Sequence, residues 1–146
     1  MLLASSVFEH NSFIPHRYTC DGEDINPPLI VSDVPANTKS LALLVDDPDA
    51  PAGDWVHWLV WNIDPSLKEI PEKSVPVGSV QGITDFGKSG WGGPCPPTGT
   101  HRYFFKLFAL DQELDLSPNS RKAEFLKAID GHVISKSELI GLYKRS

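Results

Sequence analysis

The chain has 146 residues and a formal net charge of −6. This length suits a single domain, residues 1–146, that buries roughly 68–70% of the surface exposed by its unfolded chain. The negative charge repels phosphate backbones and anionic lipid surfaces, which argues against nucleic acid as a partner. The opening MLLASSVFEHN lacks the basic stretch of a secretion signal and the apolar length of a transmembrane segment, so we expect a cytoplasmic protein.

The two cysteines, Cys20 and Cys95, lie far apart in the sequence and outside any C-x-x-C motif. That spacing does not indicate a zinc site or a redox pair. We therefore predict reduced thiols with a structural role. A disulfide between them is the alternative for an oxidising compartment or a thermophilic source.

Two apolar runs in the first half of the chain predict strands. Thirteen prolines and eleven glycines separate such short runs, a rhythm typical of strands and turns. Residues 40–45 (SLALLV) are compatible with a strand that stops at Asp46, Asp47 and Pro48. Residues 55–63 (WVHWLVWNI) are apolar on both alternating faces, as in a strand covered on two sides.

Residues 82–89, GITDFGKS, match the G-x-x-x-x-G-K-[ST] pattern of a phosphate-binding loop. Such a loop must follow a buried strand and must open a helix whose N-terminus faces the phosphates. Upstream, Pro76 and Gly78 interrupt any central strand. Downstream, GWGGPCPPTGT prevents a helix from starting at Ser89. We therefore reject nucleotide binding.

The second half of the chain predicts a third strand, residues 101–110 (HRYFFKLFAL), and then a helix, residues 118–130. A proline suits the first turn of this helix, and Phe125, Leu126 and Ile129 fall on one stripe. The tail ISKSELIGLYKR predicts a last strand, although its alternation is imperfect. The expected fold is mostly β, an antiparallel β-sandwich of two sheets with a short helix near the C-terminus.

Four polar side chains lie at the ends of the three predicted strands. Asp47 follows the first strand, His57 lies in the second, and His101 and Tyr103 begin the third. Alternation groups them with the apolar residues of their own strand faces: Leu41, Leu43 and Val45; Trp55, Leu59 and Trp61; Phe105 and Leu107. Each also has a structural interpretation, as a core histidine, a turn-forming aspartate or an ordinary strand tyrosine.

Four motifs resemble, in order, those of the phosphatidylethanolamine-binding protein family, which includes the Raf kinase inhibitor proteins. They are DDPDAP, WVHW, the GxxDFG of GITDFGKS, and WGGPCPPTGTHRYFF. The early TCDGEDINPPL and the closing GHVISKSELIGLYKR are similar to the compact bacterial and archaeal branch of the family. The resemblance covers nearly the whole chain and is far more specific than the phosphate-loop match.

The resemblance implies a two-sheet β-sandwich with a small anion-accepting pocket at the strand ends. The residues it assigns to the pocket are Asp47, His57, His101 and Tyr103, with Trp55 as a wall and Gly93 and Pro94 on the rim. Asp49 and Arg102 also match motif positions and are interpreted as structural. No metal or cofactor is implied.

These residue types suit a phosphate monoester or a carboxylate. The imidazoles and the Tyr103 hydroxyl are donors, the glycine-rich loop can add backbone N–H groups, and a protonated imidazole strengthens each bond. Asp47 would repel an anion. It therefore either fixes an imidazole tautomer or receives the ammonium group of an ethanolamine-like head group.

We predict non-catalytic binding of small phosphorylated or anionic head groups, including those of phospholipids. A kinase or protease is the candidate protein partner, and a homodimer is left open. The alternative is a hydrolase or metal-dependent enzyme that uses Asp47, His57 and His101. Against it, the two histidines lack the spacing of H-E-x-x-H, and Ser89 in GKSGW does not fit G-x-S-x-G. A third hypothesis makes a protein the main partner, with Trp91 as an exposed anchor.

Overall fold

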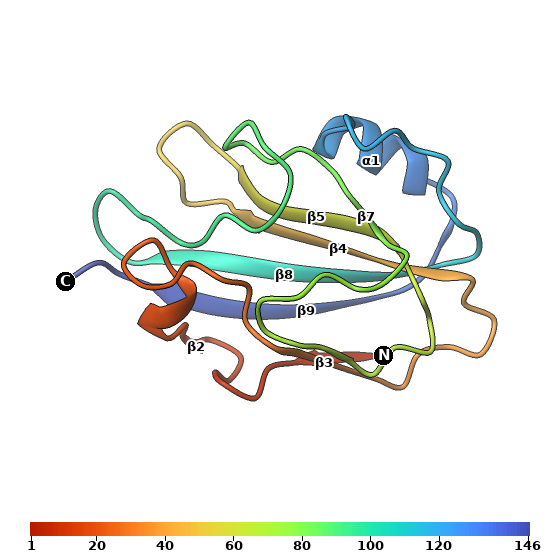
Figure 1. Ribbon diagram of the computed structural model, residues 1–146, viewed down its shortest axis with the longest axis horizontal. Helices are drawn as coiled ribbons and strands as arrows, with labels where there is room; N and C mark the ends of the chain where they lie inside the picture. Colours follow the sequence, from red (N-terminus) through yellow and green to blue (C-terminus); the bar gives the residue numbers. More distant parts are fainter.

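The long apolar runs form the centre of a six-stranded sheet in the computed structural model, which describes residues 1–146 (Figure 1). They are β4 (Ser40–Asp47), β5 (Trp55–Ile63) and β8 (His101–Leu110), which confirms the three predicted strands. The predicted last strand is also confirmed, because β9 (Val133–Tyr143) pairs with β8. Nearly every residue of β4 and β5 is buried, since both faces of the sheet are covered.

Short strands complete the two sheets. The large sheet has the order β2-β9-β8-β4-β5-β7, with β2 (Ser12–Phe13) and β7 (Val80–Gln81) at its edges. The small sheet has the order β1-β3-β6 and consists of β1 (Leu2–Ala4), β3 (Leu29–Ser32) and β6 (Glu69–Ile70). The predicted sandwich is confirmed, and its pairs are antiparallel except for the parallel pair β2–β9.

The helix covers the face of the large sheet opposite to the small sheet (Figure 1). It is α1 (Lys122–Ile129), shorter at its start than predicted because residues 117–120 form a turn instead. Phe125 and Ile129 are buried against the sheet, whereas Leu126 is 41% exposed and lies off the predicted stripe. No helix in the structure is long and apolar enough to cross a membrane.

An irregularity in β5 decides where His57 points. Asp46 pairs with Val56 and Val45 pairs with Trp58, so His57 is an extra residue between two successive pairs. This arrangement is a β-bulge, which bends the strand and redirects the side chain at the bulge.

The bulge overturns one prediction from strand alternation. His57 was expected on the same face as Leu59 and Trp61, but those two side chains pack in the core under the helix. His57 instead remains on the face of Trp55 and of the inter-sheet core that contains Trp58. Alternation fails here because a bulge adds one residue to one strand and none to its partner.

The prediction of reduced cysteines is also wrong. Cys20 and Cys95 form a disulfide, with Cα atoms 5.4 Å apart despite a sequence separation of 75. Sequence spacing gives no hint of this pair. The segment around the 3₁₀ helix η1 (His16–Tyr18) packs against the loop before β8, and this packing brings the two cysteines together.

Candidate functional site

A pocket of about 190 Å³ lies at the end of the sandwich where β4, β5 and β8 meet their connecting loops. In Figure 1 this is the left end, where the β4–β5 turn and the long loop before β8 approach each other. Five of the predicted residues line it: Asp47, Trp55, His57, His101 and Tyr103. Its remaining lining consists of Ala50, Pro51, Phe86, Cys95, Pro96 and Pro97.

Three adjacent strands bring the polar side chains together. Asp47, the last residue of β4, pairs with Trp55, the first residue of β5. On the other side of β4, the strand β8 begins at His101, and Tyr103 follows on the same face. Residues from distant parts of the sequence therefore meet because β5, β4 and β8 are neighbours that end at the same edge.

Asp47 orients the imidazole of His101. The His101 Nδ1–H donates to Asp47 Oδ2 at 2.7 Å, and both residues are buried. The other carboxylate oxygen, Oδ1, accepts the backbone N–H of Asp49 at 2.7 Å. Because a carboxylate only accepts, the proton must lie on Nδ1 of His101, and its Nε2 is left without a protein partner.

His57 is fixed in the same tautomer by a backbone carbonyl. Its Nδ1–H donates to Gly92 O at 2.6 Å, and its Nε2 is buried without any hydrogen-bond partner. Burial lowers the pKa of His57 below 6.5, while the Gly92 carbonyl and the charge of Asp47 oppose this shift. The neutral imidazole therefore presents a bare acceptor nitrogen to the pocket.

The hydroxyl of Tyr103 is the third polar group without a partner. The residue is 1% exposed, and no atom lies at the distance and angle of a hydrogen bond to its hydroxyl oxygen. Burial and then the charges of Asp47 and Asp49 raise its pKa, and the backbone N–H of Cys95 opposes the rise. The hydroxyl thus stays protonated and is an available donor. Its ring lies edge-on to that of His57, with centroids 5.1 Å apart.

The pocket contains no fixed positive charge, because no lysine or arginine is among its lining residues. Arg102, next to His101 in sequence, points outward and binds Asp49 through both carboxylate oxygens, at 2.8 and 2.9 Å. This pair lowers the pKa of Asp49 and ties the β4–β5 turn to β8. Their geometry fits the structural interpretation of both residues, and the Arg102 guanidinium supplies no positive charge to the pocket.

Gly93 and Pro94, predicted for the rim, do not line the pocket. Gly93 donates its N–H to Asp24 Oδ1 at 2.8 Å, and a Cβ at this position would lie 2.6 Å from the carbonyl oxygen of Tyr18. Pro94 accepts the backbone N–H of Cys20 at 3.1 Å. Both face the segment around η1, so the rim consists of the next three residues, 95–97.

Phe86 is a wall residue that the sequence analysis missed. Its ring contacts both Trp55 and His57 edge-on, with centroids 5.5 and 5.3 Å away. It lies in the loop 82–89, which is closed by a bridge between Ile83 and Ser89 and is not followed by a helix. A large apolar side chain between turn residues was the available signal for a wall position.

The residues of the alternative metal site do not form a cluster of candidate metal ligands. Asp47, His57 and His101 line one pocket, but no group of three or more His, Cys, Asp or Glu side chains is arranged to hold a metal ion. The Nδ1 atoms of both imidazoles are used by the protein, and Asp47 has both oxygens engaged.

Comparison with known proteins identifies the family. The family model described as phosphatidylethanolamine-binding protein matches residues 4–144. The chain belongs to this family. A UPF0098 protein of Methanothermobacter thermautotrophicus is 51% identical over 99% of both chains. A UPF0098 protein of Pyrococcus horikoshii is 50% identical over 99% of this chain and 77% of its own.

Solved structures of the family share the whole architecture. A structure described as a phosphatidylethanolamine-binding protein homolog, CT736 of Chlamydia trachomatis, has a TM-score of 0.96 at 41% identity and covers 99% of this chain and 97% of its own. YbcL of E. coli has a TM-score of 0.92 at 32% identity and covers 99% and 98%. The family resemblance and the fold predicted from the sequence are both confirmed.

The hydrogen bond from His57 Nδ1 to the Gly92 carbonyl leads to a prediction for the protonation of His57. Nitrogen NMR of the ligand-free protein should show Nδ1 protonated and Nε2 unprotonated, and the pKa of His57 should lie below 6.5 because the ring is buried. The measurement is a pH titration of the imidazole nitrogen shifts. A proton on Nε2 of the neutral ring, or a pKa at or above 6.5, would contradict this geometry.

Proposed function

We propose that the pocket binds a small anionic head group without converting it, and that a phosphate monoester such as phosphoethanolamine matches it best. The observation that carries this proposal is the convergence of three polar atoms without protein partners. They are the Nε2 atoms of His57 and His101 and the hydroxyl oxygen of Tyr103. Two of these atoms, His57 Nε2 and the Tyr103 hydroxyl oxygen, are buried without a partner. Buried polar groups in native proteins are nearly always hydrogen-bonded to protein or water, which supports a polar ligand at this place.

The size of the pocket selects a head group. A volume of about 190 Å³ is below the roughly 300–1,000 Å³ of pockets for drug-sized ligands, which suits a phosphorylated head group and not a complete lipid. The aromatic walls of Trp55 and Phe86 and the prolines of the rim cover the less polar part of such a ligand. The acyl chains of a phospholipid would remain outside.

Protonation of the imidazoles is part of the proposed binding reaction. In their neutral forms both Nε2 atoms only accept hydrogen bonds, so they cannot hold a fully deprotonated anion. An anion therefore binds together with a proton, which converts an imidazole into a charged donor and replaces the missing lysine or arginine. Asp47 serves by orienting His101, since both of its oxygens are already engaged.

The lining residues favour binding over hydrolysis. Tyr103 is the only hydroxyl residue among them, and the raised pKa of this hydroxyl makes it a poor nucleophile. No group of three His, Cys, Asp or Glu side chains is arranged to hold a metal ion, which favours binding over a metal-assisted reaction at Asp47, His57 and His101. A kinase or protease as protein partner, and a homodimer, stay predictions.

The affinity for anions should rise as the pH falls. A bound anion raises the pKa of His57, so it binds more tightly where that ring is already protonated, by at most about tenfold per pH unit for one proton taken up. Isothermal titration calorimetry from about pH 5 to 8 measures this with sulfate, whose charge is constant in this range, and with phosphoethanolamine, whose second pKa of about 6 adds its own titration. His57→Ala and His101→Ala should each lose about tenfold or more in affinity, because hydrogen bonds to charged groups contribute about 1.5–3 kcal/mol.

The matched control is His132→Ala, since His132 bonds to Asp111 on the surface and does not line the pocket. This variant should keep wild-type affinity at every pH. Sulfate binding that is independent of pH and unchanged in both pocket histidine variants would place the site elsewhere.

Tyr103→Phe should separate stability from binding. Removing a buried hydroxyl that has no full hydrogen bond relieves a desolvation cost of about 1–3 kcal/mol, so the free energy of unfolding should stay constant or rise. Anion affinity should fall by about fivefold, as one neutral donor contributes about 1 kcal/mol. Urea unfolding and sulfate titration measure the two quantities. A variant that is destabilised but binds normally would show that this hydroxyl serves the fold and not a ligand.

A further inference from the structure

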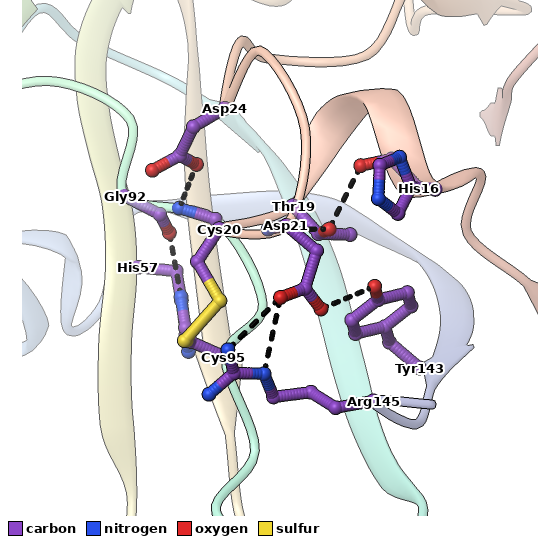
Figure 2. The surroundings of a disulfide bond; sticks show 11 residues. His16, Thr19, Cys20, Asp21, Asp24, His57, Gly92, Cys95, Tyr143 and Arg145 are labelled. Atoms are coloured by element: carbon purple, nitrogen blue, oxygen red, sulfur yellow. Dashed lines mark hydrogen bonds and ion pairs between the residues drawn. A yellow bond between two sulfur atoms is a disulfide. The ribbon is translucent and has the colours of Figure 1, made fainter.

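Cys95 belongs both to the pocket lining and to the disulfide. Its neighbours Pro96 and Pro97 line the pocket as well, so the bond to Cys20 is attached directly to one pocket wall. Figure 2 shows the disulfide crossing from the segment around Cys20 to that around Cys95, beside His57. Cys95 is exposed and Cys20 is half-buried, so an external thiol can approach from the Cys95 side.

Hydrogen bonds hold the loop before β8 up to Pro94, the residue before Cys95. Gly93 donates its N–H to Asp24 at 2.8 Å, and Pro94 accepts the N–H of Cys20 at 3.1 Å. Neither bond involves a cysteine side chain. The two bonds also keep the preceding Gly92 carbonyl against His57, so that imidazole stays oriented in either redox state.

The next six residues, 95–100, lack such support. Neither their backbone nor their side chains make a hydrogen bond of full geometry, and the regular pairing resumes only at His101. Pro96 is buried by packing, and the disulfide is the one covalent link that fixes this segment to the neighbouring loop. Apart from the packing of Pro96 and the Cys95 N–H that faces Tyr103, the disulfide is therefore what fixes the pocket wall formed by residues 95–97.

The other half of the disulfide is anchored independently. Next to Cys20, the carboxylate of Asp21 accepts the Tyr143 hydroxyl at 2.6 Å and the Arg145 guanidinium at 2.9 Å (Figure 2). Breaking the disulfide therefore leaves Cys20 in place and releases the Cys95 side, which is the pocket side.

We infer that the Cys20–Cys95 disulfide is a redox control on the pocket, and that its reduction by a dithiol releases the wall 95–97 and weakens ligand binding. This inference rests on the anion-binding function proposed above. The released wall takes with it the backbone N–H of Cys95, which faces the Tyr103 hydroxyl. The reduced pocket is wider, wetter and less ordered. Ligand binding then loses affinity, because it must also overcome the conformational entropy of ordering the loop.

The chemistry is thiol–disulfide exchange with a dithiol reductant, either a small dithiol or a protein of the C-x-x-C type. Its first thiolate attacks the sulfur of Cys95, the more exposed of the two residues, which breaks the protein disulfide, forms a mixed disulfide and releases Cys20 as a thiolate. The second thiol of the reductant then breaks the mixed disulfide and releases Cys95. Two electrons and two protons pass from the dithiol to the protein, and the reductant leaves as a disulfide.

The test compares three forms of the full chain: the oxidised protein, the protein reduced with dithiothreitol, and the double variant Cys20→Ser/Cys95→Ser. Near-ultraviolet circular dichroism first establishes that each form is folded at the working temperature. Calorimetric titration with sulfate and with phosphoethanolamine should then give at least tenfold weaker binding in the reduced protein and in the double variant. Amide order parameters of residues 98–100 should fall in the same two forms, while dithiothreitol should leave the double variant unchanged.

A second measurement keeps the inference testable if the double variant does not fold. Because coupling is reciprocal, a ligand that binds the oxidised form tenfold more tightly must make the disulfide harder to reduce, by about 30 mV. Equilibration of the wild type in dithiothreitol redox buffers, with and without saturating sulfate, measures this shift.

Equal affinity in all forms and no shift in potential would overturn the redox control and leave the proposed function intact. Tighter binding in the reduced form would also overturn it. If neither probe binds even the oxidised protein, the proposed anion-binding function fails, and the control inferred from it fails with it.

Discussion

The site depends on one constraint, which is that both pocket imidazoles are held through Nδ1. Asp47 holds His101 at 2.7 Å, and the Gly92 carbonyl holds His57 at 2.6 Å. Since both partners are pure acceptors, the proton of each neutral ring is fixed on Nδ1 and each Nε2 is a bare acceptor. Under the proposed function, a pocket without fixed cations could still accept an anion, because the ligand and a proton would enter together.

Two parts of the fold hold the imidazoles in this arrangement, the strands of the large sheet and the segment around η1. The order β5-β4-β8 places Asp47 beside His101, and the bulge in β5 turns His57 toward them. On the opposite side, the segment around η1 supports the loop that contains Gly92, through Asp24 and through the disulfide. Native proteins tolerate unpaired buried polar atoms mainly where function requires them, which supports the proposal that this pocket binds a ligand.

The family resemblance assigned Asp47, His101 and Tyr103 to a pocket. Strand alternation grouped these residues correctly with the apolar faces of their own strands, because β4 and β8 pair without a register shift. It misplaced the neighbours of His57, since a bulge depends on the partner strand and leaves no trace in hydrophobic periodicity. That the strands lie side by side was supplied by the family resemblance. A sequence does not state which strand ends meet.

The loops were the least predictable part. Gly93 and Pro94 were expected at the rim on motif position alone, but one tight backbone approach turns them toward the segment around η1. The disulfide was only the alternative prediction for a related reason, because its cysteines are 75 positions apart and meet through packing that no local pattern encodes. Phe86 lay inside a recognised motif and was still overlooked, since an isolated aromatic in a loop does not reveal what it faces.

The most direct test of the account is the number of protons taken up when an anion binds. Calorimetric titration of sulfate into the oxidised protein, repeated at one pH near 7 in buffers of different ionisation enthalpy, gives that number from the slope of the binding enthalpy. The account predicts an uptake of about one proton per sulfate, because a neutral imidazole with its proton on Nδ1 must gain a second one to donate through Nε2. Sulfate binding with no proton uptake would contradict it.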